Sequence, residues 1–159
     1  MLLANTEARP RLDRARLADL VRLAASAGEW AGLVRYTEGE RWYRRLERGE
    51  NHEVWLLSWL PGQHTGFHDH GEAVGAFGVA RGRLSERTVP AGRSQARSRS
   101  VSAGTVRSFG SKHVHDVQNN WAEPAVSVHA GERSNTGFSF ASCSGVVLAR
   151  RLLSWRRPW

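Results

Sequence analysis

Residues 62–70 read GQHTGFHDH, and this stretch decides the fold. His68 and His70 are two positions apart, so on a β-strand both side chains would point to the same face and both imidazoles could reach one metal ion. Gly75 follows, and Gly82 comes after a short apolar run. The stretch therefore predicts a pair of metal ligands on a strand with a glycine-containing turn on each side.

A second stretch, residues 104–119, supplies the third candidate ligand. His115 lies where the pattern predicts another strand, and His113 has the same parity, which makes it the rival ligand. An isolated His-x-His pair is more often two histidines on a half-buried strand than a metal site. The flanking glycines and the third histidine favour the metal site here.

Together the two stretches resemble the paired cupin motifs, Gly-x5-His-x-His-x4-(Glu)-x6-Gly and Gly-x10-His-x3-Asn. The resemblance implies a mainly β protein, namely a cupin-type jelly-roll β-barrel with N-terminal helices. The spacing to Gly104 and Asn119 selects His115 over His113 as the third ligand. Where many cupins place a fourth, carboxylate ligand, this chain has Gly75.

The absence of that carboxylate narrows the chemistry. Three neutral imidazoles leave the full positive charge on a bound metal and leave about three sites of an octahedral shell open. Non-haem iron oxygenases use such open sites to bind substrate and O2 together. An all-histidine face suits a substrate that brings its own anionic ligand, such as a thiolate.

Further segments are similar to the bacterial cysteine dioxygenase (thiol dioxygenase) family. They are WLPG at residues 59–62, HDVQN at 115–119 and EPAVSVH at 123–129, and the similarity runs from about Trp42 to His129. In that family three histidines bind Fe(II), the substrate chelates through its thiolate and amine, and O2 is added to sulfur to give a sulfinate.

Carried over by position, the resemblance implies that His68, His70 and His115 are the Fe(II) ligands and that the substrates are a small thiol, cysteine, and O2. The same chemistry on 3-mercaptopropionate, which lacks the amine, is one alternative. Arg45 stands in place of a glutamine of the family, which favours cysteine. The other alternative is a catalytically weak metal-binding or ligand-binding cupin.

The resemblance also implies roles outside the metal ligands. Tyr43 and Arg45 match the family's Tyr-x-Arg, whose arginine pairs with the substrate carboxylate, and Tyr43 is a candidate catalytic residue. A guanidinium offers a planar fork to a carboxylate. Arg44 would face the other side of the strand, and the alternative for this arginine-rich stretch is a solvated face. Ser127 and His129 match a Ser-x-His pair whose hydrogen bonds poise a group beside the iron.

After His129 the resemblance ends. The family continues with an aliphatic residue and then Tyr-Ser-Pro-Pro, and its tyrosine hydroxyl points into the iron site. This chain has Gly131 at the position of that tyrosine. Two explanations stay open, a tail that has diverged and a shift of the reading frame near Gly131.

Apolar periodicity predicts an amphipathic helix at residues 11–26 and a second short helix at 30–34. Short β patterns follow, with Gly and Pro between them, as in a barrel or double-sheet jelly roll. We expect strands at residues 41–44, 53–59 and 73–80 and an exposed loop or edge strand at 95–102. The chain then divides into an N-terminal helical segment packed on the barrel (1–36), a cupin core with the metal site (37–130) and a divergent C-terminal tail (131–159).

Composition adds constraints. The chain has 159 residues, of which 40% are hydrophobic and 24% charged, enough for one domain with a sizeable core. The net charge of +8 comes from arginines spread along the chain without a long basic run, so we expect no specific nucleic-acid partner. Cys143 is the single cysteine, which fits a reducing cytoplasm without disulfides. With no export signal and no apolar span, we expect a cytoplasmic protein without membrane contact, and a monomer.

Overall fold

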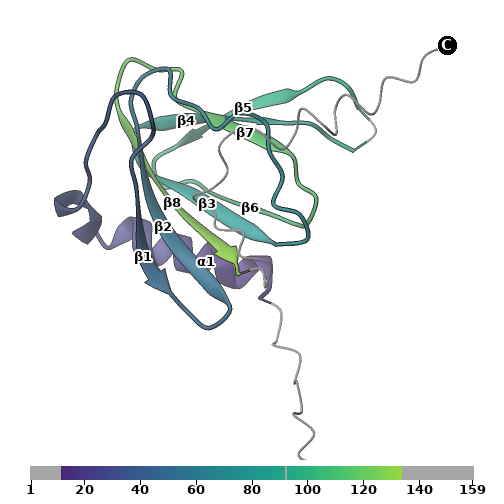
Figure 1. The fold of residues 1–159 in the computed structure, drawn as a ribbon, viewed down its shortest axis with the longest axis horizontal. Coiled ribbons are helices and arrows are strands. Elements are labelled where there is room, and N and C mark those ends of the chain that lie inside the picture. The colour runs from purple at the N-terminus through teal and green to yellow at the C-terminus, as the bar shows by residue number, and fades with distance from the viewer. Residues whose placement is uncertain (1–11, 92, 134–159) are drawn as a thin grey trace, which may run out of the picture.

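A computed structural model describes residues 12–91 and 93–133 of the chain. One α-helix, one 3-10 helix and eight strands make up this part (Figure 1). The elements are α1 (Arg14–Ser26), η1 (Glu29–Gly32), β1 (Tyr43–Arg48), β2 (His52–Trp59), β3 (Gly75–Arg81), β4 (Arg83–Thr88), β5 (Arg97–Ser102), β6 (Val106–Phe109), β7 (His115–Gln118) and β8 (Ala125–Glu132).

The strands form two antiparallel sheets. One has five strands in the order β1-β2-β8-β3-β6, and the other has three in the order β5-β4-β7. Figure 1 shows the smaller sheet lying across the larger one. One hydrophobic cluster draws side chains from both sheets, among them Trp59, Phe77, Leu84 and Val117. The predicted mainly β jelly-roll architecture is therefore confirmed.

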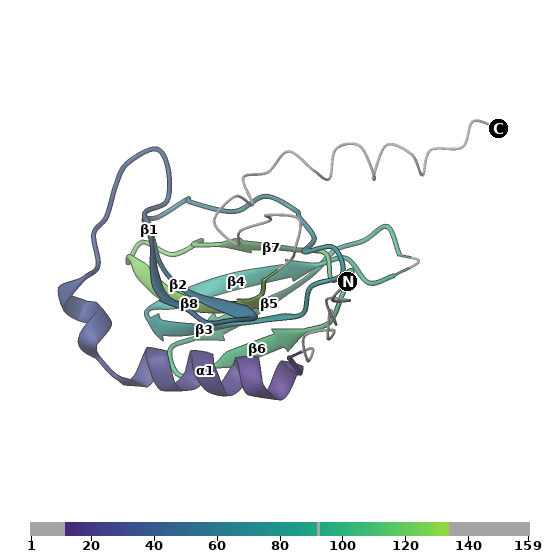
Figure 2. The ribbon, with the colours of Figure 1, turned by 60° about the horizontal axis from the view of Figure 1, so that its bottom comes forward.

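Helix α1 covers the outer face of the five-stranded sheet (Figure 2). Its buried residues Leu17, Ala18 and Val21 belong to a second cluster together with Leu56 and Val128 of the sheet. The helix begins after Asp13, whose carboxylate accepts a hydrogen bond from the Arg16 amide at 2.8 Å and so caps the first turn. The helix predicted at 11–26 is thus observed from Arg14 to Ser26. The helix predicted at 30–34 is a short 3-10 helix that runs from Glu29 to Gly32.

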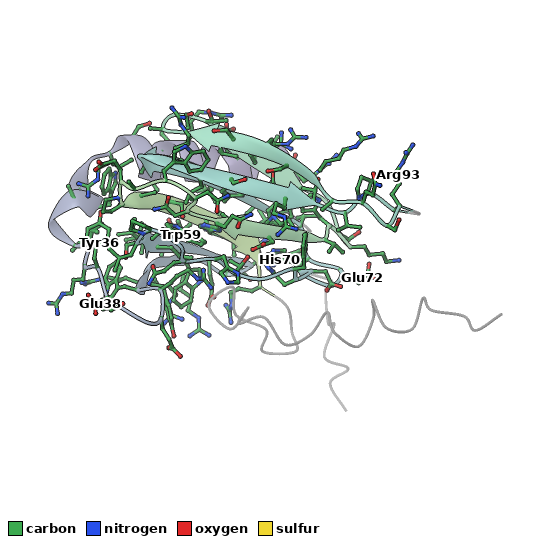
Figure 3. The ribbon with its side chains drawn as sticks, turned by 90° about the horizontal axis from the view of Figure 1, so that it is seen from above. Tyr36, Glu38, Trp59, His70, Glu72 and Arg93 are labelled. Atoms are coloured by element: carbon green, nitrogen blue, oxygen red, sulfur yellow. The ribbon has the colours of Figure 1, made fainter. Side chains whose placement is uncertain are left out.

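Strand β2 is covered on both faces, which explains its nearly continuous apolar sequence. Trp55, Leu57 and Trp59 point between the sheets, whereas Val54 and Leu56 pack toward α1. Figure 3 shows Trp59 within the body of the molecule. The inward positions of β2 matter for function, because they continue into the candidate site described below.

The loop-or-edge-strand prediction for residues 95–102 resolves as an edge strand. Residues 97–102 form β5, which pairs with β4 on one side and exposes most of its residues. At the turn between β3 and β4, Gly82 has a φ of +77°, and a Cβ there would lie 2.9 Å from the Pro124 carbonyl oxygen. Only glycine fits that turn without strain, which accounts for the last glycine of the first motif.

Within the described residues, no helix combines the length and the apolar character that crossing a bilayer requires.

Candidate metal centre

Residues 62–70 run antiparallel to β7, and this pairing brings the motif histidines together. The His68 amide donates to the His115 carbonyl at 2.9 Å, and the His115 amide donates to the His68 carbonyl at 3.0 Å. The Thr65 amide extends the pairing with a 2.9 Å bond to the Val117 carbonyl. The prediction of a regular strand for His68 to His70 is wrong in this respect, because their segment makes isolated bridges only. The predicted strand for His115 is confirmed as β7.

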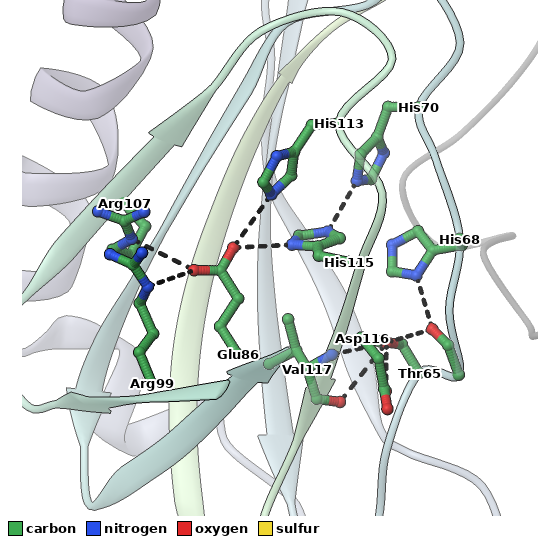
Figure 4. A network of polar contacts seen from close by, with 11 residues as sticks. Thr65, His68, His70, Glu86, Arg99, Arg107, His113, His115, Asp116 and Val117 are labelled. Carbon is green, nitrogen blue, oxygen red and sulfur yellow. Dashed lines mark hydrogen bonds and ion pairs between the residues drawn. The ribbon is translucent and has the colours of Figure 1, made fainter. Parts of the chain in front are cut away.

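The three histidines converge on one point. One ring nitrogen each of His68, His70 and His115 lies within 4.8 Å of the other two. The Nε2 atoms of His70 and His115 are 3.1 Å apart (Figure 4). All three side chains are buried, with exposed fractions of 6%, 8% and 2%. Three buried nitrogen donors that converge on one point are a typical metal-binding set.

Partners of the opposite ring nitrogens set the tautomers of two of these rings. His68 Nδ1 lies 2.9 Å from the Gly66 carbonyl oxygen, and His115 Nδ1 lies 3.1 Å from Glu86 Oε1. Both partners can only accept, so each Nδ1 carries the proton and each Nε2 keeps its lone pair. The lone pairs of His68 and His115 are therefore available to a metal ion.

The geometry fits an ion at this point. Two imidazole nitrogens that bind one ion at about 2.1 Å and at right angles lie about 3.0 Å apart. The observed separation of 3.1 Å between His70 Nε2 and His115 Nε2 is close to that value. The donor set suits Fe(II), Zn(II) and related divalent ions, and the open remainder of the shell suits exchangeable ligands.

Burial keeps these imidazoles neutral. It lowers the pKa of His68 from 6.5 to about 4, with the nearby His115 and Arg41 acting in the same direction. Burial also lowers the pKa values of His70 and His115, although the hydrogen bond to Glu86 opposes it at His115. Neutral rings at pH 7 are the form that binds metal.

The metal-free protein should accordingly lose stability in acid. Between pH 6.5 and about 4 the unfolded chain binds a proton at His68 that the folded chain does not, so the free energy of unfolding falls as the pH falls. For His68 alone the loss is about 3 kcal/mol, and His70 adds to it in the same direction. Urea unfolding of metal-free protein from pH 7.5 to pH 4 would measure it. Constant stability over that range would show that the rings are not held neutral.

Asn119, the last residue of the second motif, has a structural role. Its side chain is fully buried and donates to the Trp59 carbonyl at 3.1 Å and to the Glu123 carbonyl at 2.9 Å. It also accepts from the Trp121 amide at 3.0 Å. These bonds tie the end of β7 to the end of β2 and so hold the strand that carries His115.

Ser127 and His129 lie side by side on β8, facing the site. Ser127 Oγ lies 2.8 Å from His129 Nε2, and the Trp59 indole donates to the same Oγ at 2.8 Å. The hydroxyl accepts from Trp59 and still has a second lone pair and its own proton, so it can bond His129 Nε2 in either tautomer of that ring. Burial lowers the pKa of His129 well below 6.5, with His115 and Arg41 contributing.

A small pocket joins these residues. Its walls come from the segment before β1 and from β2, β7, β8 and the 62–70 segment, and the lining residues are Arg41, Leu57, Thr65, His68, His70, His115, Val117 and His129.

Arg41 is the cation of this pocket, and the sequence interpretation did not single it out. Its guanidinium carbon lies 4.8 Å from the centre of the Trp59 ring. Its charge reaches both His68 and His129, since it lowers the pKa of each. The sequence pointed to Arg41 only through the two-residue repeat of a strand. That repeat places residues 41, 43 and 45 on one face but does not say which of them lies at the pocket.

Arg45 and Tyr43 lie on the same face but farther along β1. Arg45 pairs with Glu53 at 3.3 Å and lies 5.5 Å over the Trp55 ring, with its side chain 43% exposed. Tyr43 is 50% exposed and contacts the edge of Trp55 at 5.9 Å between ring centres. Arg44 pairs with Leu56, which packs toward α1, so it faces the opposite side as expected. The roles assigned to Arg45 and Tyr43 by resemblance stay predictions.

His113 lies behind the histidine cluster. Its Nε2 is 3.2 Å from Glu86 Oε1, and its ring stacks on Phe109 with 5.0 Å between centres. The side chain is 24% exposed, so it reaches toward solvent while the three clustered histidines do not. A second group of possible ligand atoms comprises Glu86, His113 and His115.

Gly75 and Gly131 are cross-strand partners on β3 and β8. The position where many cupins have a carboxylate ligand therefore lies opposite the position of the family's tyrosine. Neither position has a side chain in this protein. Strand β8 continues to Glu132, and the rest of the predicted tail from residue 134 lies outside the described residues.

Comparison with known families agrees with this geometry. The profile of the family described as cysteine dioxygenase type I matches residues 6–133, most of the chain. The protein belongs to this family. Membership makes it a cupin-superfamily thiol dioxygenase by descent, an enzyme class that acts on a small molecule and O2. A search of curated proteins finds no match.

Solved structures with the same fold agree with the cupin assignment. The protein TT1209 from Thermus thermophilus is 19% identical, with a TM-score of 0.58, over 65% of this chain and 93% of that one. A double-stranded β-helix protein from Klebsiella pneumoniae is 20% identical, with a TM-score of 0.56, over 84% and 96%. A cupin superfamily protein from Desulfitobacterium hafniense is 10% identical, with a TM-score of 0.55, over 65% and 87%. At these identities the likeness concerns the fold alone.

Proposed function

We propose that this protein is an Fe(II)-dependent thiol dioxygenase that converts L-cysteine and O2 to cysteine sulfinate. The observation that carries the proposal is the buried cluster of His68, His70 and His115 in a chain of the cysteine dioxygenase type I family. Fe(II) held by three neutral imidazoles would supply open coordination sites for a thiolate and O2 and the electrons for oxygen activation. The proposal places the reaction in a reducing cytoplasm, where a free thiol persists.

Arg41 would hold the substrate carboxylate. It is the lining residue that carries a fixed positive charge, and it is half-buried beside Trp59. A guanidinium can take both carboxylate oxygens at once, which fixes the orientation of the substrate as well as adding attraction. Arg45 lies outside the lining of the pocket and pairs with the Glu53 carboxylate. We therefore assign the carboxylate to Arg41 and keep Arg45 as the alternative.

Ser127 and His129 would orient a proton toward the pocket. The Trp59 indole donates to the Ser127 hydroxyl, which lies 2.8 Å from His129 Nε2. Burial lowers the pKa of His129 well below 6.5, so the ring is neutral and one of its two nitrogens carries a proton. A neutral donor can stabilise negative charge that develops on the substrate or on oxygen without repelling the metal.

Substrate choice is the finer question. Cysteine and 3-mercaptopropionate share the thiolate and the carboxylate, and they differ in the amine. An arginine pairs with either carboxylate, so the amine must be recognised by the metal or by a polar group of the pocket. Cysteine remains the leading substrate because of the family match.

A weakly catalytic metal-binding protein is the second candidate, and one observation favours it. Gly131 supplies no hydroxyl where the family has its tyrosine. All other elements of the proposed site are compatible with either function.

One assay separates these possibilities. Iron-loaded protein would be given L-cysteine or 3-mercaptopropionate, and both O2 uptake and sulfinate would be measured. Sulfinate from cysteine at the higher kcat/KM supports the proposal, and a preference for 3-mercaptopropionate would reassign the substrate. Iron binding without sulfinate from either thiol would establish the binding protein.

Coupling between oxygen uptake and product should be poor in this protein. The missing tyrosine hydroxyl is one positioned donor, and losing such a donor costs about 10- to 100-fold. We expect O2 consumed to exceed sulfinate formed, and we expect Gly131→Tyr to bring the ratio closer to one. Its cross-strand partner is Gly75, so no side chain opposes the ring from that position. Gly131→Phe is the matched control, since it adds the ring without the hydroxyl. A wild-type ratio of one to one would mean that another group fills the role.

A further inference from the structure

Glu86 is the most deeply buried carboxylate described, and the proposed mechanism has not used it. It lies on β4 with an exposed fraction of 1%. Strands β5 and β7 flank β4, so Glu86 lies opposite Arg99 on one side and Val117 on the other. Figure 4 shows the carboxylate beside the His115 ring, on the side away from His70.

The two oxygens of Glu86 face different partners. Oε1 lies 3.1 Å from His115 Nδ1 and 3.2 Å from His113 Nε2. Oε2 accepts from Arg107 Nε at 3.2 Å, and Arg99 Nε lies 4.0 Å away. One oxygen therefore serves the histidine side, and the other serves the arginine side.

Glu86 has the partners of a buried carboxylate ion. The Arg107 guanidinium donates to Oε2, and the His113 and His115 imidazoles both lie within 3.2 Å of Oε1. A buried carboxylate without such partners would take up a proton instead. The arginine already supplies the cation that this carboxylate needs, so Glu86, His113 and His115 form a support for the histidine cluster rather than a second ion site.

We infer that Glu86 is a positioning residue of the metal centre, one that holds His115 in its metal-binding tautomer and supplies negative charge from behind the ring. The inference rests on the proposed metal site. Glu86 would act on the metal through the His115 ring. It would take over part of the electrostatic role that a carboxylate ligand has in other cupins. Gly75 cannot play that role, because it has no side chain.

Two physical effects follow from this contact. A carboxylate that accepts from Nδ1 raises the basicity of Nε2, which strengthens the bond to a metal. It also offsets the positive charge that three neutral ligands leave on the ion. Arg107 and Arg99 weaken this second effect without cancelling it, since their side chains are 32% and 51% exposed and solvent screens them. The His115 contact is buried on both sides and is screened much less.

A purely structural role is the competing explanation, in which Glu86 only ties β4 to Arg107 on β6. Such a role would change stability when Glu86 is altered and leave the affinity of the folded protein for metal unchanged. The tautomer of His115 would then be independent of Glu86. Metal affinity and tautomer are therefore the readouts that decide.

The first experiment compares Glu86→Gln with Glu72→Gln. Glu72 is two residues from His70, but its side chain is exposed and pairs with Lys112. Glu72→Gln therefore makes the same chemical change near the site at a residue paired with Lys112 rather than with a ligand ring. Fe(II) and Co(II) affinities would be measured by competition with a chelator under anaerobic conditions. We expect Glu86→Gln to weaken both by about 10- to 100-fold and to raise the Fe(III)/Fe(II) potential, with Glu72→Gln close to wild type. Equal affinities for wild type and folded Glu86→Gln would overturn the inference.

A second experiment needs no variant and stands if Glu86→Gln fails to fold. Nitrogen-15 NMR of the histidine rings in metal-free wild-type protein reports which nitrogen carries each proton. We expect His115 protonated on Nδ1, with a proton shift typical of a hydrogen bond to a carboxylate. A proton on Nε2 would overturn the inference. Wild-type protein that binds neither metal would instead reject the proposed metal centre, which is a separate outcome.

Discussion

Replacing His115 with alanine is expected to remove iron from the protein. His115 supplies one of three ring nitrogens that lie within 4.8 Å of one another, and its Nε2 is 3.1 Å from that of His70. Without it, two imidazoles cannot define a face of an octahedron. The loss of affinity should exceed about 100-fold, because even partners outside the ligand set contribute 10- to 100-fold. Metal analysis of protein loaded anaerobically with Fe(II) would measure the loss, and thiol-dependent O2 uptake should disappear with the iron.

His113→Ala is the comparison that tests the choice of third ligand. His113 has the same parity in the sequence, but its ring contacts Glu86 and Phe109 rather than the two other clustered rings. The His113→Ala variant should therefore retain most of its iron. Its iron content should fall only slightly, because the change lies beside Glu86. Iron that survives in His115→Ala and is lost in His113→Ala would exchange the two assignments.

The histidine cluster could be predicted because sequence spacing constrains it so tightly. His68 and His70 are two residues apart, and residues 62–70 pair with β7 in one register, which fixes the position of His115 as well. The local structure was predicted less well. A regular strand was expected at His68, but the turns around this segment, with positive φ at Gly66 and Gly71, limit its pairing to single bridges.

Glu86 and Arg41 show what sequence spacing does not reveal. Glu86 belongs to no motif and lies between Ser85 and Arg87, where an alternating strand would equally present an exposed glutamate. Its burial follows from the pairing of β4 between β5 and β7, a long-range arrangement. Arg41 lies among several arginines, and only the register of β1 against β2 decides which of them reaches the pocket.

That register depends on an irregularity in β1. The pairing shifts between Arg45 and Glu47, and the Ser58 amide donates to the Trp42 carbonyl at 3.0 Å just before the strand begins. Counting by twos from Tyr43 predicts a shared face but cannot place a bulge. The pairing at Trp42 sets Arg41 beside Trp59 at the pocket and leaves Arg45 beside Glu53.

Arg41→Ala should therefore reduce kcat/KM for cysteine more than Arg45→Ala does. Loss of a two-oxygen contact to the substrate carboxylate is expected to cost about 2–4 kcal/mol of transition-state stabilisation, or about 30- to 1000-fold. Arg41→Lys should fall between wild type and Arg41→Ala, because it keeps the charge and loses the planar fork. Steady-state sulfinate formation on equally iron-loaded proteins would measure all three.

Cysteamine, which has the thiol and amine of cysteine but no carboxylate, makes the test specific. If Arg41 binds the carboxylate, Arg41→Ala should lower kcat/KM for cysteine and leave kcat/KM for cysteamine nearly unchanged. The ratio of the two values should then fall by about the same factor as kcat/KM for cysteine. A variant that merely disturbs Trp59 or the pocket wall would slow both thiols alike and leave the preference unchanged. A large change of preference in Arg45→Ala, with none in Arg41→Ala, would return the carboxylate to Arg45 and would require the Glu53 pair to open when substrate binds.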